Sequence, residues 1–258
     1  KILYWYDNNK RVLPWRKKTS KTKREYYTLV SEFMLQQTQV TTVIPYFNNF
    51  IRDIPNLTSL SKITDDKLLK YWEGLGYYSR VKNLKKTAQI VRRKFKGRLP
   101  ITIDKLKTLP GIGDYTANAI MAIAFNKPFI PLDGNIERVI KRLLNLKLAN
   151  EVSKENLIKE KKILGTSTRS SDYAQSLMEL GALVCKPKIP LCSQCPVTKD
   201  CKSFKKNDFE IIKQKKKKIN KFYLVEVYKK NNQFLLIKNT KFNFLKNLKI
   251  FPMKEISK

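Results

Sequence analysis

The segment Leu109-Pro110-Gly111-Ile112-Gly113 is the most informative about the fold, because it is predicted to form a tight turn between two helical segments. Residues 103–108 before it are short and amphipathic, and residues 114–125 after it have a good helical pattern. The alternate glycines allow a tight turn and leave backbone N–H groups free to approach a phosphate in front of the second helix. The pattern predicts a helix-hairpin-helix, which grips the DNA backbone without reading its sequence. The alternative is a plain junction between a loop and a helix.

The chain around this hairpin is predicted to be helical up to about Leu183. Apolar residues recur at spacings of three and four in residues 2–5, 27–43, 67–72, 81–91, 117–125 and 136–144. Short breaks that contain Pro or Gly separate these segments. The sequence therefore predicts an all-α region of many short helices.

The pattern changes after Cys201. Residues 205–221 form a strongly basic run that is either a solvated linker or an arm facing phosphates. Residues 222–228 and 233–237 are predicted to be two β-strands joined as a hairpin through Lys230-Asn231-Asn232. A second, β-containing domain is thus expected to begin near residue 222. The residues from 221 to 258 are too few to enclose a core alone.

Composition narrows the function. Lys and Arg number 54 against 21 Asp and Glu, a net charge of +33, which favours a polyanionic partner, although coding bias in a Lys-, Asn- and Ile-rich chain is an alternative source. Histidine is absent, which excludes Ser-His and Cys-His catalysis and His-ligated zinc. No apolar stretch is long enough for a membrane span, and residues 1–9 lack the apolar core of a signal peptide. We expect an intracellular protein without a membrane partner.

All four cysteines lie within seventeen residues, in a C-x6-C-x2-C-x5-C pattern: Cys185, Cys192, Cys195 and Cys201. This density suits one metal site, whereas disulfides do not fit a chain kept reduced inside a cell. Structural zinc is possible, but its ligands usually come as two close pairs with a longer insert between them. A 4Fe-4S cluster, which also takes four thiolates, is the favoured interpretation. The lysines of this loop could then contact phosphates.

Two carboxylates are candidates for chemistry. Asp133 lies in Leu132-Asp133-Gly134-Asn135, before a predicted helix, and could serve only as its N-cap. Glu32 is followed by three apolar residues within a stretch of uncharged polar residues suited to base edges, and could be only a solvated helix residue. Sequence does not show whether the two side chains meet.

Together these segments resemble the helix-hairpin-helix superfamily of endonuclease III and, within it, the adenine DNA glycosylases of MutY type. The resemblance covers residues 2–203 and rests on these segments and on Leu13-Pro14-Trp15-Arg16, Gly74-Leu75-Gly76-Tyr77-Tyr78 and Glu179-Leu180-Gly181-Ala182. It implies a six-helix barrel with the hairpin (25–129), an iron-sulfur cluster helical domain (1–24 and 130–204), a basic linker (205–221) and a partial MutT-like domain (222–258).

The resemblance also implies an activity. Where bifunctional relatives place a Schiff-base Lys, this chain has Tyr115, so we expect a monofunctional enzyme that removes adenine mispaired with 8-oxoguanine or guanine from duplex DNA. Glu32 would protonate adenine, and Asp133 would stabilise the sugar cation. We expect it to act as a monomer in the bacterial cytoplasm, at the nucleoid.

Further roles follow from the same resemblance. Asn135 and Tyr115 would orient Asp133 and the sugar, and Gly111 and Gly113 would hold the DNA backbone. The remaining expected contacts are Trp15, Arg16 and Gln175 in the adenine pocket, Gln37 and Tyr77 in the opened base stack, and Leu35 and Thr38 near the opposite base. Core packing is the alternative for Trp15, Leu35 and Tyr77.

Three other functions compete with this one. An endonuclease III-like glycosylase for oxidised pyrimidines would need an amine nucleophile at the position of Tyr115. A non-catalytic iron-sulfur DNA-binding protein would not need both carboxylates. A nucleotide pyrophosphohydrolase is disfavoured because no Glu-rich metal-binding helix follows the C-terminal hairpin.

Overall fold

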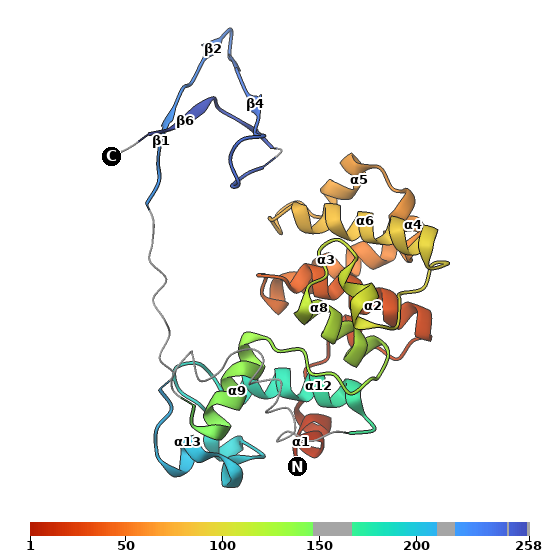
Figure 1. The fold of residues 1–258 in the computed structure, drawn as a ribbon, viewed down its shortest axis with the longest axis vertical. Helices are drawn as coiled ribbons and strands as arrows, with labels where there is room; N and C mark the ends of the chain where they lie inside the picture. The colour runs from red at the N-terminus through yellow and green to blue at the C-terminus, as the bar shows by residue number, and fades with distance from the viewer. Residues whose placement is uncertain (147–166, 211–219, 247, 257–258) are drawn as a thin grey trace. The chain divides into compact units, whose positions relative to one another are not determined.

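The computed structural model describes residues 1–146, 167–210, 220–246 and 248–256 (Figure 1). The chain divides into two compact units, Lys1–Lys213 and Gln214–Lys258. The described part of the first unit is built from helices and turns, and that of the second contains short strands. This confirms the predicted all-α region followed by a β-containing one. The expected linker, 205–221, lies partly outside the described residues.

The first unit contains short helices, as the periodicity predicted. None of those in the described ranges is long and apolar enough to cross a bilayer. Their bounds are α1 (Ile2–Asn9), α2 (Lys21–Leu35), α3 (Val40–Asp53), α4 (Leu57–Lys62), α5 (Asp65–Lys70), α6 (Ser79–Lys94), α7 (Ile103–Lys107), α8 (Asp114–Ala119), α9 (Gly134–Leu144), α12 (Ser170–Glu179) and α13 (Lys202–Lys205). Two of them, α8 and α12, continue as π-helical turns, Ile120–Ala124 and Leu180–Val184.

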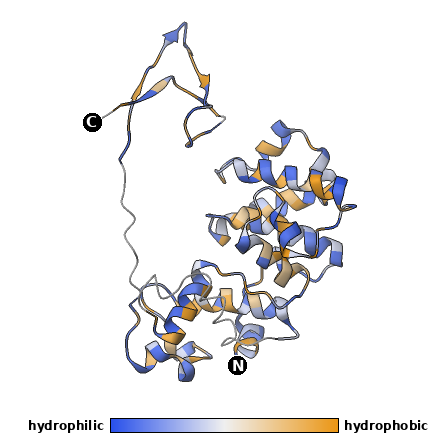
Figure 2. Cartoon of the chain, viewed as in Figure 1, coloured by the Kyte–Doolittle hydropathy of each residue, from blue (hydrophilic) through white to orange (hydrophobic). Residues whose placement is uncertain are grey.

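The larger hydrophobic core lies among α2, α3, α4 and α6. Leu29, Phe33, Phe47, Trp72 and Leu84 are all buried in it. The same helices carry hydrophilic residues on their other faces, so that orange and blue alternate along each of them in Figure 2. Burial of this amphipathic pattern, rather than helix propensity, holds such short helices in place.

Smaller cores form where α9 packs on α12 and on the turn that follows it. Ile136, Ile140 and Leu177 form one of these cores, and Val139, Leu180 and Val184 form another. Helix α1 packs against α12 (Figure 1). Two segments of the helical unit that are about 170 residues apart in sequence therefore lie side by side.

The structure differs from the predicted pattern at residues 27–43, which are not one continuous apolar helix. Helix α2 ends at Leu35 and α3 begins at Val40. Gln37, between them, has a left-handed backbone with φ of 58°. The buried guanidinium of Arg80 donates hydrogen bonds to the last carbonyls of α2, including one to Met34 O over 2.9 Å. A cation at a helix C-terminus satisfies carbonyls that have no partner within the helix.

The second unit contains three short antiparallel pairs. The predicted turn is correct: Asn231 and Asn232, both with positive φ, join β2 (Lys229–Lys230) to β3 (Gln233–Phe234). The strands are shorter than predicted. The first, β1 (Phe222–Val225), pairs instead with β6 (Met253–Ile256), and β4 (Ile237–Lys238) pairs with β5 (Lys249–Ile250). Many apolar side chains here are exposed, so this part of the chain encloses little core of its own.

Candidate active site

A cleft of about 690 Å³ lies in the first unit. This volume is within the usual range for a small-molecule site. The residues that line the cleft come from the turn Pro14–Arg16, the end of α2, the start of α9 and α12. Its lining includes nearly all of the catalytic and base-contacting residues that the resemblance implied: Trp15, Arg16, Glu32, Leu35, Gln37, Thr38, Tyr77, Tyr115, Asp133, Asn135 and Gln175.

Glu32 is buried near the C-terminal end of α2, in the wall of the cleft. Its burial raises the pKa of the carboxyl to about 7, and the negative charge of Asp133 acts in the same direction. A hydrogen bond from Tyr115 and the charge of Arg16 oppose this rise in the pKa. A carboxyl with a pKa near neutrality can hold a proton and then release it to a substrate. Glu32 is therefore suited to act as a general acid.

Asp133 is the N-cap of α9 and also lines the cleft. Its Oδ1 accepts hydrogen bonds from the backbone N–H of Asn135 over 3.0 Å and of Ile136 over 2.7 Å. Its Oδ2 accepts one from Asn135 Nδ2 over 3.0 Å. Burial raises the pKa of Asp133, but these hydrogen bonds act against the rise. Asp133 is thus an N-cap that also lines the cleft, and the cap fixes the direction of the carboxylate.

The two carboxyls, 101 positions apart in sequence, meet in the one cleft, which sequence alone could not show. Tyr115 joins them: burial raises its pKa well above the ordinary value, and the charges of Glu32 and Asp133 raise it further. Its hydroxyl is therefore protonated and can donate a hydrogen bond. One carboxyl that is readily protonated and a second held by a helix N-terminus are chemically suited to act as an acid and a charge stabiliser.

A buried ion pair in the cleft was not predicted from the sequence. Glu179, at the end of α12, is fully buried and pairs with Arg11 Nη2 over 2.8 Å and with Arg16 Nη2 over 2.9 Å. Burial acts to raise the pKa of Glu179, but the hydrogen bond from Arg11 and the charge of Arg16 outweigh it and hold the pKa below its ordinary value. The Glu179-Leu180-Gly181-Ala182 match was the only signal for this residue.

Several polar atoms that belong to the cleft lining are buried and have no hydrogen-bond partner in the described structure. They are Arg16 Nε, Thr28 Oγ1, Glu32 Oε2 and Arg80 Nε. Buried polar atoms are normally paired, and leaving one unpaired costs about 1–3 kcal/mol. A cleft that leaves donors and acceptors unpaired is suited to a polar ligand such as a nucleobase.

Arg80 was also missed by the sequence analysis, and it holds two loops at the mouth of the cleft. Its guanidinium donates to Leu75 O over 2.8 Å and to Thr38 Oγ1 over 3.1 Å, as well as to carbonyls at the end of α2. The loop with Thr38 also carries Gln37, and the loop with Leu75 also carries Tyr77. Both Gln37 and Tyr77 have a left-handed backbone. No local pattern marks Arg80, because its partners lie on other elements.

Trp15, Leu35 and Tyr77, for which core packing was the alternative role, differ in how far they are buried. Trp15 and Leu35 pack against the larger core, and the Trp15 ring lies edge-on to Phe47 at 5.3 Å, yet both residues also line the cleft. Tyr77, in contrast, has 63% of its surface exposed. Core packing is therefore the wrong explanation for Tyr77.

The hairpin glycines lie apart from the cleft lining. Gly111 has φ of 81°, and a Cβ there would lie 2.7 Å from the ring of Phe33, so this position requires glycine. Gly113 precedes α8, and a Cβ there would meet no atom within 4 Å. Space in front of Gly113 leaves room for a phosphate, as expected for a helix-hairpin-helix.

The four cysteines line a single cavity of about 30 Å³. Among the described residues, no three Cys, Asp or Glu side chains are close enough together to hold one metal ion. Helix α9 links this loop to the carboxylate site: Arg138 Nε donates to Cys185 O over 2.8 Å, and Arg138 Nη2 donates to Asn135 Oδ1, also over 2.8 Å. Arg142, one turn later, donates to Lys186 O and Pro187 O.

Comparison with known proteins identifies the class. Residues 30–162 match the model of the HhH-GPD superfamily of base excision DNA repair proteins. The fold is similar to that of a thermostable thymine-DNA glycosylase, with a TM-score of 0.69 and 26% identity over 80% of this chain and 94% of that one. It is also similar to endonuclease III in a non-covalent DNA complex, with a TM-score of 0.64, 21% identity and the same coverage.

Curated relatives narrow the family further. The chain is 39% identical to an adenine DNA glycosylase of Buchnera aphidicola subsp. Baizongia pistaciae, over 97% of this chain and 72% of that protein. It is 40% identical to the human adenine DNA glycosylase, over 78% of this chain and 38% of that protein. The chain belongs to the adenine DNA glycosylase family of the HhH-GPD superfamily, which confirms the resemblance seen in the sequence.

Proposed function

We propose that this protein is a monofunctional adenine DNA glycosylase, which removes adenine mispaired with 8-oxoguanine or guanine from duplex DNA. One observation carries the proposal: a carboxyl with a pKa of about 7, Glu32, shares a cleft with the capped carboxylate of Asp133. The names of the relatives support adenine as the base. Extrusion of a mispaired base into such a cleft costs only a few kcal/mol.

Each of the two carboxyls has its own role in the reaction. Glu32 transfers its proton to N7 of adenine, so that the base leaves as a neutral molecule when the bond to C1′ breaks. The negative charge of Asp133 stabilises the positive charge that develops on the sugar. A water molecule then adds to C1′ and loses its proton, which leaves an abasic site. Asn135 and Tyr115 orient the two carboxyls, and Arg16 and Gln175 face the base.

The absence of lyase chemistry is part of the proposal. Among the described residues that line the cleft, the basic ones are arginines, and none is a lysine. An arginine stays protonated and does not form a Schiff base, so an amine nucleophile is not provided there. The expected product is an intact strand with an abasic site.

The DNA contacts and the cofactor complete the proposal. Gly111 and Gly113 would hold a phosphate, and Gln37, Tyr77, Leu35 and Thr38 would contact the opened duplex from the loops that Arg80 holds. The four cysteines would hold a 4Fe-4S cluster, because all four line one cavity and four thiolates are what such a cluster requires. The cluster would fix the loop that bears Lys186, Lys188 and Lys199. The iron-sulfur domain, barrel, linker and partial MutT-like domain keep the boundaries given above, and the protein would act as a monomer in the bacterial cytoplasm.

Single-turnover release of adenine opposite 8-oxoguanine, guanine and thymine tests the proposal. We expect release from the first two duplexes and none from the third, and no release by the Glu32→Gln protein. Release at the parent rate by Glu32→Gln would contradict the proposed acid. Borohydride trapping of the protein on DNA would favour the endonuclease III-like alternative. Tight, salt-sensitive binding without base release would favour a non-catalytic DNA-binding protein.

A further inference from the structure

Gln175 is one of the residues that line two neighbouring cavities. On one side is the cleft with Glu32 and Asp133, and on the other is a smaller cavity of about 210 Å³. Ser171, one turn earlier on α12, lines the smaller cavity and not the cleft. The direction of the Gln175 amide therefore decides whether a donor or an acceptor faces the cleft.

The hydrogen bonds of Ser171 fix that direction. Gln175 Nε2 donates to Ser171 O over 3.2 Å and to Ser171 Oγ over 3.2 Å. A backbone carbonyl only accepts, so the amide group that faces it must be the NH₂ end. The hydroxyl of Ser171 donates its proton to Ile123 O over 3.2 Å, and so it can only accept from Gln175. Two separate constraints thus give the same orientation.

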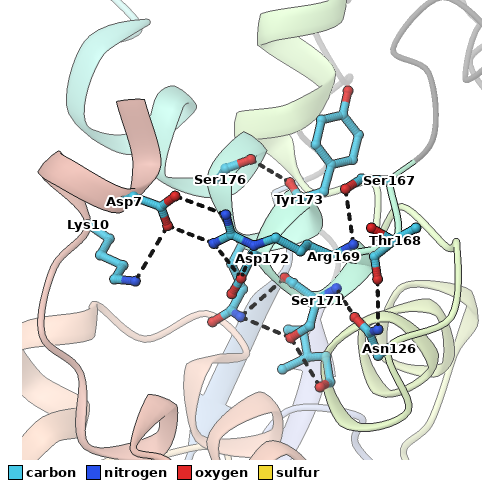
Figure 3. Close-up of polar contacts among 12 residues, drawn as sticks. Asp7, Lys10, Asn126, Ser167, Thr168, Arg169, Ser171, Asp172, Tyr173 and Ser176 are labelled. Carbon is cyan, nitrogen blue, oxygen red and sulfur yellow. Dashed lines mark hydrogen bonds and ion pairs between the residues drawn. The ribbon is translucent and has the colours of Figure 1, made fainter. Parts of the chain in front are cut away.

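Ser171 is itself held in place. Its backbone N–H donates to Asn126 Oδ1 over 2.8 Å, and Asn126 Nδ2 donates to Thr168 O over 3.0 Å. Next to it, Arg169 pairs with Asp7 of α1 and with Asp172, as Figure 3 shows. The first turn of α12 is therefore anchored to two other segments, and the serine does not move freely with the amide.

The remaining end of the amide is its carbonyl oxygen. No described residue donates a hydrogen bond to Gln175 Oε1, and that atom is not among the buried unpaired ones. Because Nε2 is turned toward Ser171 and the smaller cavity, Oε1 is the end on the side of the cleft. The cleft thus receives an acceptor from Gln175.

We infer that Ser171 is a specificity-determining positioning residue, which holds Gln175 so that its carbonyl oxygen selects purines with a 6-amino group over purines with a 6-oxo group. The inference rests on the proposed function. The amino group of adenine would donate to Oε1. The oxygen of hypoxanthine would place a second acceptor against it, and a buried acceptor left without a donor is strongly disfavoured.

Substitution of the serine tests this role. Without its hydroxyl, Gln175 loses one of its two Nε2 acceptors and can turn its NH₂ group into the cleft. We expect Ser171→Ala to lower the ratio of adenine to hypoxanthine release, each opposite 8-oxoguanine under single-turnover conditions, by about tenfold. Ser171→Thr, which keeps the hydroxyl, should retain the parent ratio. If the alanine protein does not fold, Ser171→Cys, with a weaker donor and acceptor, should lower the ratio instead.

Ser176→Ala is the matched control. Ser176 lies on the same helix and donates to Tyr173 O over 2.7 Å, away from the amide, so its loss should leave the ratio unchanged. An unchanged ratio in a folded, active Ser171→Ala protein would overturn the inference and leave the proposed function intact. A parent protein that releases neither base would instead contradict the proposed function itself.

Discussion

Gly181 lies directly against Asn135: a Cβ added at Gly181 would be 2.6 Å from Cβ of Asn135 and 2.9 Å from its backbone carbonyl. Asn135 in turn holds Asp133 through its side chain and its backbone N–H. The absence of a side chain at Gly181, in the turn after α12, therefore helps to set the position of the Asp133 carboxylate at the start of α9.

Gly181→Ala should reduce adenine release by tenfold or more, because the backbone at the start of α9 must move to relieve the contact. DNA binding should change little. Single-turnover kinetics and a binding assay separate the two effects. Gly97→Ala is the control: Gly97 has φ of 77° and lies outside the cleft lining, so its substitution should cost stability without slowing base release in the folded protein. Equal rates for Gly181→Ala and the parent would contradict this role.

Base release should depend on pH through Glu32. Its pKa is about 7, and only the protonated carboxyl can act as the acid. We expect a constant rate below about pH 6 and a fall approaching tenfold per pH unit above pH 8. The measurement is the single-turnover rate between pH 5.5 and 9 at constant ionic strength. A rate that stays constant to pH 9 would rule out this carboxyl as the proton donor.

Glu32→Gln should be inactive but more stable than the parent at high pH. Burial raises the pKa of Glu32 from 4.5 to about 7, so the neutral form is favoured in the folded protein. That contribution to stability is present below pH 4.5 and is lost as the pH rises through 7. At pH 8 the substitution should raise the free energy of unfolding by about 3 kcal/mol, and at pH 4 it should have little effect. Urea unfolding at both pH values measures the difference; equal stabilities at pH 8 would show that the carboxylate is not desolvated.

Arg80→Lys should loosen the two loops at the mouth of the cleft. A lysine keeps the charge, but it cannot reach carbonyls of both loops at once, because it lacks the planar fork of the guanidinium. We expect a loss of about 2–4 kcal/mol in the free energy of unfolding and slower base release at temperatures where the protein is folded. Arg93→Lys, at an exposed position of the same helix, is the control. Fluorescence of 2-aminopurine at the target position would show whether base extrusion is the step that slows.

Cys195→Ser should remove the metal from the cysteine loop. The proposed cluster needs all four thiolates, so the variant should lose iron and acid-labile sulfide and have a lower Tm than the parent. Metal analysis of both proteins, purified without oxygen, provides the measurement. One equivalent of zinc and no iron in the parent protein would replace the cluster with a structural zinc site.

Local patterns predicted most of the helices and the hairpin turn, because burial of apolar faces and short-range turn chemistry determine both. Gly111 and its hairpin are an example, since positive φ and a close neighbour leave only glycine. The break after Leu35 could not be predicted in this way. It depends on Arg80, which lies 45 positions later and satisfies the carbonyls there.

Features that depend on distant residues were beyond the sequence alone. The meeting of Glu32 and Asp133, the ion pair of Glu179 and the pairing of β1 with β6 all join segments that no periodicity connects. The first of these could be anticipated only through resemblance to a family. The pKa of Glu32 likewise arises from how the rest of the chain excludes water from it.

The N-cap role of Asp133 means that reactivity and folding cannot be adjusted separately at this position. One oxygen of the carboxylate accepts hydrogen bonds from the backbone of α9. In the proposed reaction the negative charge of the same carboxylate stabilises the sugar. During evolution, drift at residue 133 would therefore meet two selective pressures at once, one against loss of repair and one against loss of the helix start. A lineage that no longer needed the activity would still have a physical reason to retain an aspartate there.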